Sequence, residues 1–392
     1  MDLARVPIVD NHCHPMSPAK ANLPPLQLAL EFYHGLGDRE DPTGRASKGL
    51  VSAERLADIA ELGVVHTLVA RLSRLLGCEP TLEAVAAERN RRVEQEGLAA
   101  WAAALYAEAH IAATVIDSDL PDGAPALALQ PGRVLRLFQM GPAIQQLLAG
   151  SASWEALVQG YCADLEHAVR VAGAVGVKSH LAEVVGLGAP PADLAEGAAH
   201  WSAAKAGDRA AWRRVYSALF GLTLLECQRL EVPVHVHTGI TGGAWDGPVG
   251  DADPFLLAAW LRLPAYRASR VVLLHAGYPW IESASLMAHA CPQVWVDISW
   301  VTPWVSLRAV ECLRALLASA PLSRLMIGTG GHGTPEVAWL GAHMARHGLQ
   351  RVLSEAVEEG LLAPAQAPRL AAMILGENAA RLYGLELAEP AP

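Results

Sequence analysis

Short runs of β-branched residues alternate with stretches rich in Ala and Leu from about residue 111 onward. This alternation constrains the fold more than any other feature, because it is typical of βα units built around a parallel sheet. Segments with the composition of strands occupy residues 6–14, 112–119, 133–138, 176–182, 232–239, 271–277, 294–299 and 325–331. Eight such strands with following helices predict an α/β fold, a closed (β/α)8 TIM barrel. An open doubly wound sheet is less favoured, since no glycine-rich phosphate-binding motif follows the first strand.

The first two predicted strands are separated by about 100 residues, which is far longer than an ordinary loop. Residues 52–65 and 82–110 within this interval have helical patterns, as do residues 209–230 and 336–360 between and after later strands. We therefore expect a single barrel domain over residues 1–392, with a helical insertion at about residues 20–110 that folds over the active-site face.

Composition excludes several classes of protein. Hydrophobic residues make up 52% of the 392 residues and charged residues only 18%, which indicates a folded chain with a large core. The formal net charge of -10 argues against a nucleic-acid partner, because phosphate binding requires clustered Lys and Arg. The sequence shows no signal peptide and no long apolar run, so we expect no membrane contact and a cytoplasmic location.

Histidines stand at the ends of three predicted strands: His12, His14, His237 and His275. His12 and His14 point to the same face, because side chains alternate along a strand. Barrel enzymes build their active sites at the carboxyl ends of strands, and neutral imidazoles on one face can bind one metal ion together. A lone histidine at such a position is more often a hydrogen-bonded structural residue. Three strands that each end in histidine favour a metal site.

Other candidates could bind substrate. Lys178 lies on the fourth predicted strand, where it could bind substrate as a cation, bridge metal ions if carboxylated, or simply reach solvent. His235 and His180 have the inward parity of His237 and Lys178, and each could support the ligands from behind or pack in the interior; His235 is also a candidate for substrate binding. His332 follows the eighth predicted strand within a glycine-rich turn.

The motifs at the strand ends resemble those of a known family. They are DNHCHP at residues 10–15, PVHVHTG at 233–239, LLHAGYPW at 273–280, VDISW at 296–300 and IGTGGHGTPE at 327–336. Together they resemble the amidohydrolase-related group of the amidohydrolase superfamily, and most of all the amidohydrolase part of nodulin/glutamine-synthetase-like fusion proteins. The resemblance covers nearly the whole chain and is weakest in the helical insertion.

The resemblance implies that His12, His14 and His237 are metal ligands, and that His275 is either a ligand or an acid/base. It also implies an aspartate at the end of the eighth strand, where this chain has Gly330. A glycine can neither bind a cation nor accept a proton. Three alternatives would explain the missing aspartate: this copy has lost activity, the chain was engineered to trap a substrate complex, or His332 is a substitute ligand. A glycine at this position also suits a tight turn.

The related fusion proteins also tend to carry an arginine soon after the position of Lys178. This chain has Glu183 there instead, which leaves room for a substrate of different charge.

The function that the resemblance implies is hydrolysis of an amide-type C–N bond in a small molecule by metal-activated water. Zn is the favoured metal, and Mn, Fe or Co would suit the same ligands. Non-oxidative decarboxylation on the same scaffold is the alternative reaction, and a catalytically silent barrel that only binds a ligand is an alternative that Gly330 permits. The expected partner is a small-molecule substrate, and assembly into a homo-oligomer is compatible with the sequence.

Overall fold

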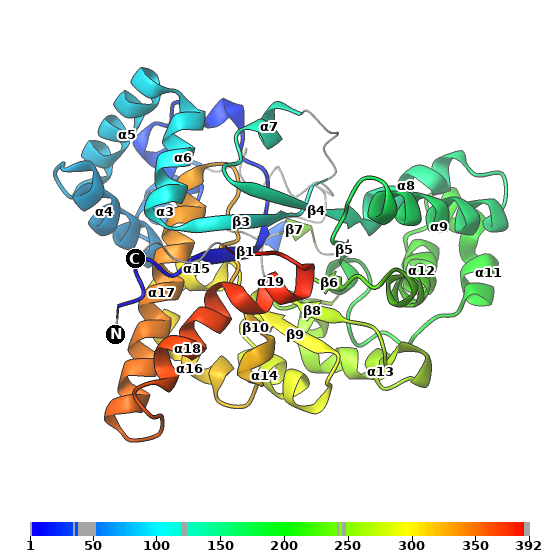
Figure 1. The fold of residues 1–392 in the computed structure, drawn as a ribbon. Helices are drawn as coiled ribbons and strands as arrows, with labels where there is room; N and C mark the ends of the chain where they lie inside the picture. The colour runs from blue at the N-terminus through cyan, green and yellow to red at the C-terminus, as the bar shows by residue number, and fades with distance from the viewer. Residues whose placement is uncertain are drawn as a thin grey trace.

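The computed structural model describes residues 2–33, 36–37, 52–118, 124–240, 243–244 and 248–387. Eight parallel strands form one sheet in the order β1-β3-β4-β5-β6-β8-β9-β10 (Figure 1). Their bounds are β1 Ile8–Cys13, β3 Ile111–Ile116, β4 Arg133–Gln139, β5 Gly176–Ser179, β6 Val234–Val236, β8 Val271–Leu273, β9 Val294–Asp297 and β10 Leu325–Met326. Each lies within or next to a predicted strand segment, so the eight predicted strands are confirmed.

Backbone hydrogen bonds join the two outermost strands of this sheet. The amide of Asn11 donates to the carbonyl of Ile327 at 2.9 Å, and the amide of Gly330 donates to the carbonyl of His12 at 2.9 Å. These bonds link the end of β1 to the residues after β10, so the sheet closes on itself. The predicted (β/α)8 barrel is therefore confirmed.

Helices connect the strands and surround them. Their bounds are α1 Pro25–Leu30, α3 Ala53–Ala60, α4 Gly63–Leu76, α5 Leu82–Glu96, α6 Leu98–Glu108, α7 Pro125–Ala128, α8 Met140–Gly150, α9 Trp154–Arg170, α10 Leu181–Val184, α11 Leu194–Lys205, α12 Arg209–Leu230, α13 Ala258–Leu261, α14 Ile281–Ala290, α15 Val301–Trp304, α16 Ala309–Leu317, α17 Pro335–Glu358, α18 Gln366–Ala372 and α19 Asn378–Tyr383. The predicted helix at 209–230 coincides with α12. This helix begins where the Asp208 side chain accepts hydrogen bonds from two backbone amides of the first turn.

The insertion between β1 and β3 contains α1 and the four helices α3 to α6 (Figure 1). The predicted helix at 82–110 is divided into α5 and α6 at Gly97, whose φ of +89° is unfavourable for other residues. The predicted helix at 52–65 is likewise divided between α3 and α4. Backbone pairing between β2 (Leu36–Gly37) and β7 (Gly243–Ala244) joins the segment after β1 to the segment after β6.

The barrel interior has an apolar part and a polar part. Val9, Ala113, Val272 and Met326 from four strands form one cluster, and Leu382 of α19 packs into it. The remaining core lies mainly between the strands and the outer helices. Histidines and carboxylates occupy the interior at the carboxyl ends of the strands, so the apolar part supports a polar mouth.

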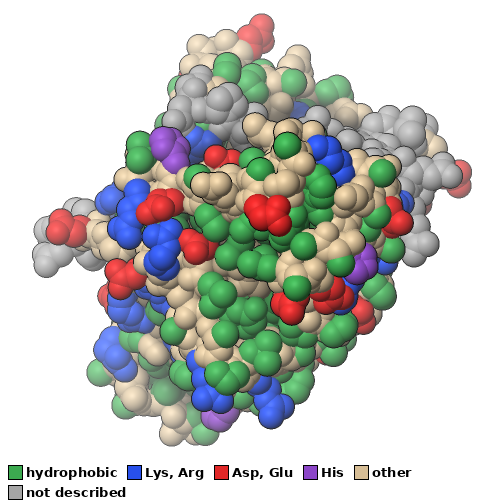
Figure 2. Space-filling view, turned by 90° about the vertical axis from the view of Figure 1, so that its right-hand side faces the viewer, with side chains coloured by type: hydrophobic (Ala, Val, Ile, Leu, Met, Phe, Trp, Pro, Cys, Tyr) green, Lys and Arg blue, Asp and Glu red, His purple; other side chains and the backbone are tan. Residues whose placement is uncertain are grey.

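The surface shows both charge signs. On the face in Figure 2, acidic and basic side chains are interspersed around a central area of hydrophobic side chains. Within the described residues, no helix combines the length and apolar character that crossing a membrane requires.

Candidate metal centre

Five histidines form a continuous row at the mouth of the barrel. Their ring centroids follow one another at 5.1 Å from His14 to His12, 5.2 Å to His275, 4.7 Å to His237 and 6.0 Å to His180. The four histidines predicted as metal ligands therefore come together, although they derive from strands far apart in the sequence. We call these five residues the histidine row.

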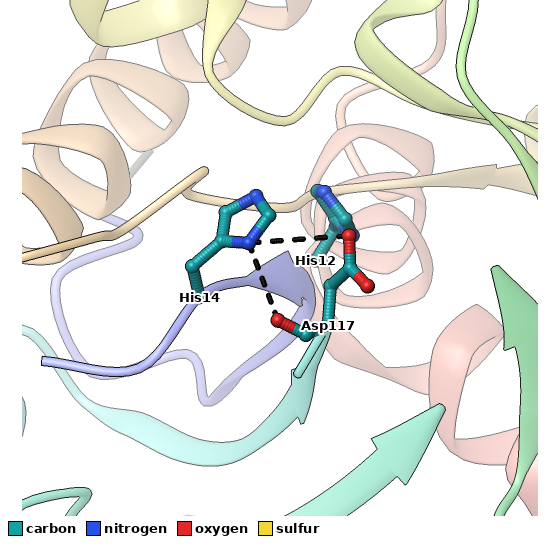
Figure 3. Close-up of side chains that lie close together, drawn as sticks. All are labelled: His12, His14 and Asp117. Carbon is teal, nitrogen blue, oxygen red and sulfur yellow. Dashed lines mark hydrogen bonds and ion pairs between the residues drawn. The ribbon is translucent and has the colours of Figure 1, made fainter. Parts of the chain in front are cut away.

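A carboxylate stands at each end of the histidine row. Asp117, directly after β3, lies beside His12 and His14, and the three residues offer ligand atoms within 4.8 Å of one another (Figure 3). Glu183 of α10 lies in the same way beside His180 and His237, again within 4.8 Å. The donors therefore divide into two groups of three.

Lys178 is buried and paired with the first carboxylate. Its Nζ atom lies 3.0 Å from Oδ2 of Asp117, and the side-chain amide of Gln139 donates to the other carboxylate oxygen. Burial alone would raise the pKa of Asp117, but the charges of Lys178 and His14 bring the pKa down to about 2. The alternative that Lys178 reaches solvent is wrong, because its side chain is only 1% exposed.

The geometry and charge state of the histidines suit a metal ion. Within the part of the chain that the structure describes, neither ring nitrogen of His12 has a hydrogen-bond partner, although both are buried. Burial lowers the pKa of His12 well below its ordinary value, and the charge of Lys178 lowers it further. Burial has the same effect on the pKa of His237 and His275. Neutral imidazoles keep the lone pair that a metal requires, so the residues present fit a divalent cation.

The ring of His275 is oriented by a chain of buried polar contacts. Its Nδ1 atom lies 3.0 Å from the hydroxyl and 3.2 Å from the carbonyl oxygen of Ser299. The amide of Ser299 donates to Asp297 at 2.8 Å, and Asn11 donates to the same carboxylate at 3.0 Å. Asp297 also accepts a backbone hydrogen bond from His275, so it helps to position this histidine both directly and through Ser299.

Unusual backbone conformations gather beside this histidine. His275, Ala276 and Trp300 have φ values of 62°, 45° and 68°, in the left-handed region that residues with a side chain rarely adopt. The Trp300 ring stacks on Trp304 at 4.7 Å and lies 6.2 Å from His275. Backbone strain of this kind is concentrated at functional sites in proteins. The aromatic pair forms a wall next to the histidine row.

Gly330 stands in a tight turn packed against Trp300. Its φ is +66°, and a Cβ atom added there would lie 2.4 Å from Cβ and 2.7 Å from Cα of Trp300. An aspartate at this position would collide with the neighbouring backbone. The tight-turn interpretation explains this glycine, and the expectation that a carboxylate at 330 would complete the ligand set does not fit this backbone.

The two other residues predicted to bind substrate, His332 and His235, form hydrogen bonds within the protein. The ring nitrogens of His332 lie 2.9 Å from the carbonyl of Gly330 and 3.0 Å from that of Glu31. The structure therefore does not bring His332 into the histidine row as a substitute ligand. His235 is fully buried in the barrel interior, with Nε2 3.0 Å from the hydroxyl of Tyr383.

Sequence reasoning missed the two carboxylates as donors. Asp117 stands at the end of a predicted strand, as His237 does, so the criterion applied to the histidines could have found it. In the sequence, Glu183 stands out only because the related fusion proteins tend to carry an arginine in this segment. Its three-residue spacing from His180 would place both side chains on one face of a helical turn.

The chain is similar in sequence to known proteins. A family model described as amidohydrolase matches residues 156–385. Protein fluG of Emericella nidulans is 30% identical over 288 residues, which are 67% of this chain and 32% of the relative. The chain thus spans about a third of the length of this curated relative.

Solved structures share the fold. A protein from Lactobacillus casei described as a metal-dependent hydrolase has a TM-score of 0.79 at 21% identity, covering 97% of this chain and 96% of that one. A uronate isomerase from Bacillus halodurans has a TM-score of 0.64 at 13% identity, covering 98% and 94%. At such identities the likeness shows the barrel alone.

Proposed function

Because this chain belongs to the amidohydrolase family, we propose that it is a metal-dependent hydrolase that cleaves an amide-type C–N bond of a small molecule. One observation carries the proposal. The mouth of the barrel holds the histidine row, in which His12, His237 and His275 are buried. Among the described residues, neither ring nitrogen of His12 has a hydrogen-bond partner. Buried polar atoms are rarely left unsatisfied without a ligand to complete them.

A divalent cation would be held by His12 and His14 together with Asp117, and His237 and His275 form the wall beside it. When bound, such an ion polarises a substrate carbonyl and lowers the pKa of water. Nitrogen and carboxylate donors suit Zn best, and the same set accepts Mn, Fe or Co.

His275 is the residue that we propose moves the proton. Its Nδ1 lies 3.2 Å from the carbonyl oxygen of Ser299, an acceptor only, and 3.0 Å from the Ser299 hydroxyl, which can also accept; we therefore assign the proton of the neutral ring to Nδ1. Nε2 therefore keeps its lone pair. In the hydrolysis, Nε2 would take a proton from the attacking water and return it to the leaving amine. Position 330, in the loop after β10, is a glycine and not an acidic residue, so it cannot take part in this proton transfer.

The surroundings of the centre suggest how substrate is positioned. Trp300 and Trp304 offer an aromatic face to the apolar part of a small molecule. Of the residues predicted to bind substrate, Lys178 is the one for which we keep that role, because its ammonium group lies inside the centre, against Asp117. His235 and His332 instead contact Tyr383 and backbone carbonyls.

We also retain three expectations about context as proposals: a cytoplasmic location, no nucleic-acid or membrane partner, and assembly into a homo-oligomer. The net charge of -10 supports the exclusion of nucleic acid. The interspersed charges in Figure 2 agree with it on that face.

The test replaces both His12 and His14 with Ala and measures metal content by elemental analysis. We expect the variant to lose the ion of this centre and all release of amine from a panel of small amides. An Ala substitution of the exposed His66 is the control and should change neither quantity.

Stoichiometric metal retained at this centre after both substitutions would contradict the assignment. Release of carbon dioxide instead of amine by the unaltered protein would replace hydrolysis by decarboxylation. Full metal content without turnover on any substrate would indicate a barrel that only binds a ligand.

A further inference from the structure

We propose that a cavity at the amino ends of β1 and β3 binds a small anion with at least two negative charges, of the phosphate or carboxylate class. The cavity lies between the N-terminal segment, α4, the end of α6 and α17, on one side of the barrel (Figure 1). Its volume of about 420 Å³ is within the usual range for small-molecule sites and leaves room for an organic part beside the anionic groups.

This cavity is separate from the metal centre. Arg5 comes shortly before β1, and His110 comes directly before β3. His12, His14 and Asp117 stand at the carboxyl ends of the same two strands. The two sites therefore lie at opposite ends of the barrel, and the proposal does not rest on the proposed function.

Basic side chains outnumber acidic ones in the lining. The basic residues are three arginines and three histidines, namely Arg5, Arg71, Arg346, His110, His343 and His347. Among the described residues, the acids of the lining are Asp2 and Glu108, and both have partners of their own. The Glu108 carboxylate accepts a hydrogen bond from Trp339 and lies 2.7 Å from the ring of His343, and Asp2 accepts one from the amide of Ala4 at 2.9 Å. An excess of positive charge therefore remains in the cavity.

Arg71 is the observation that points to an anion. This residue is half-buried on α4, and its guanidinium has no hydrogen bond or ion pair with any described residue. Burial lowers the pKa of Arg71, and the charge of Arg74, one turn away on the same helix, lowers it further. A half-buried cation without an acceptor is costly, and a bound anion would supply the acceptor.

Arg346 of α17 brings a second guanidinium to the cavity in a fixed position. The residue is buried, and its two terminal nitrogens donate to the carbonyl oxygens of Ala109 at 2.5 Å and of Val6 at 2.6 Å. Its Nε atom has no hydrogen-bond partner in the described part of the chain. Burial lowers the pKa of Arg346 to about 10, so the group remains charged at neutral pH. Because the residues before β1 and β3 hold this charge in place before any ligand binds, less entropy is lost on binding.

The side chains of the lining also select the class of ligand. A guanidinium can donate two parallel hydrogen bonds to one phosphate or carboxylate group. His110 and His347 are exposed at the rim, where each imidazole can donate one further hydrogen bond. The net charge of -10 disfavours nucleic acid as the occupant, so the expected ligand is a small anion.

The experiment is isothermal titration calorimetry of the full chain with glycerol phosphate and, separately, with succinate, in a buffer that contains no other polyvalent anion. We expect at least one of the two probes to bind saturably at one site per chain, and to raise the melting temperature. Arg71→Gln should weaken this binding about tenfold or more, because charge-assisted hydrogen bonds are lost. Glu108→Gln should strengthen it about threefold, because a negative charge leaves the same cavity.

Arg74→Gln is the matched control, because Arg74 is exposed on the same helix and does not line the cavity. This substitution should change the Kd by less than about twofold, since solvent and salt screen an exposed charge. Without added anion, Arg71→Gln should melt no lower than the unaltered protein, because it removes no ion pair with a described residue. Binding of neither probe, or equally strong binding by Arg71→Gln, would overturn the proposal. Binding that is kept in Arg71→Gln and lost in His12→Asn would place the anion at the metal centre and would also overturn it.

Discussion

Arg89 of α5 and Glu336 of α17 form a buried ion pair beside the mouth of the barrel, with 2.8 Å between Nε and Oε1. The other guanidinium nitrogens donate to the carbonyl oxygens of Ala21 at 2.6 Å and Lys20 at 2.8 Å. Trp101 donates to the carboxylate of Glu336 at 2.6 Å. We call these residues the Arg89 cluster, and it ties the insertion to the start of α17.

The metal centre is also buried and charged, but its polar atoms are incompletely paired. Both ring nitrogens of His12 and the Oε2 atom of Glu183 have no hydrogen-bond partner in the described part of the chain. The Oδ2 atom of Asp117 is likewise without a hydrogen bond, although Lys178 lies beside it. Both clusters consist of buried ionisable side chains, so burial does not distinguish them.

The difference between the clusters lies in what completes them. The Arg89 cluster is completed by the chain itself, which is the arrangement expected of a structural contact. In the metal centre, buried nitrogen and oxygen atoms lack hydrogen-bond partners among the described residues, which lowers stability. Such an arrangement is expected where a bound ligand supplies the missing partner. Between these two clusters, incomplete pairing of the polar atoms is what distinguishes the metal centre from the structural contact. The following predictions test this comparison.

The largest effect on stability is expected in the Arg89 cluster. Arg89→Met leaves the Glu336 carboxylate buried without its cation, so we expect the free energy of unfolding to fall by about 3–5 kcal/mol. Urea denaturation of the metal-free protein measures this. Glu183→Gln is the comparison in the metal centre and should change stability by less than about 1 kcal/mol, because its Oε2 atom accepts no hydrogen bond from the described residues. Equal losses in the two variants would remove the distinction.

The next effect tests the backbone that supports the metal centre. Gly330→Ala should lower the free energy of unfolding by about 2–4 kcal/mol, because alanine disfavours the left-handed backbone conformation at this position and its Cβ atom would collide with Trp300. Gly360 has a similar φ of +73° but open space around it, so Gly360→Ala should cost only about 1 kcal/mol. Gly330→Asp meets the same contacts and should add no turnover. A stable Gly330→Asp variant with new amide hydrolysis would show that the turn tolerates a carboxylate.

A smaller effect, seen in turnover and not in stability, is expected from the histidine row. His275→Asn removes the proposed proton carrier and should lower kcat by about a hundredfold, or about 2.7 kcal/mol in the barrier. His289→Asn is the control, because the Nδ1 atom of His289 also lies 3.2 Å from a carbonyl oxygen, that of Ser319, but outside the site. If steady-state kinetics show a change below about threefold for His275→Asn, the residue is structural.

The smallest effect is expected from a pair at the surface. Glu108 lies 2.7 Å from His343; burial alone would raise the pKa of Glu108, but this contact lowers it below the ordinary 4.5. A lowered pKa in the folded state stabilises the protein above pH 4.5, and this contribution is lost as the pH falls through the lower value. Glu108→Gln should therefore cost less than about 1 kcal/mol at pH 7 and nothing at sufficiently acid pH. A melting-temperature difference that grows as the pH falls would contradict this sign.

Much of the fold and half of the candidate centre could be predicted without coordinates. The eight strands were found because each is a local run of β-branched residues, and α12 was found because helical periodicity is local. His12 and His14 were brought into one group by strand alternation and position alone. The division of the insertion helices was missed, because the φ of Gly97 depends on how α5 and α6 pack.

The barrel and the histidines at its mouth could thus be predicted from local patterns in the sequence, and the resemblance of the strand-end motifs indicated the family. Only the tertiary structure decided that Asp117 and Glu183 join different ends of the histidine row. Only it decided that Lys178 is paired inside the centre, and that the backbone at Gly330 excludes a side chain. The physical reason is that these features are distances between residues far apart in the chain. Strand register and the packing of neighbouring loops set those distances, and no local pattern encodes them.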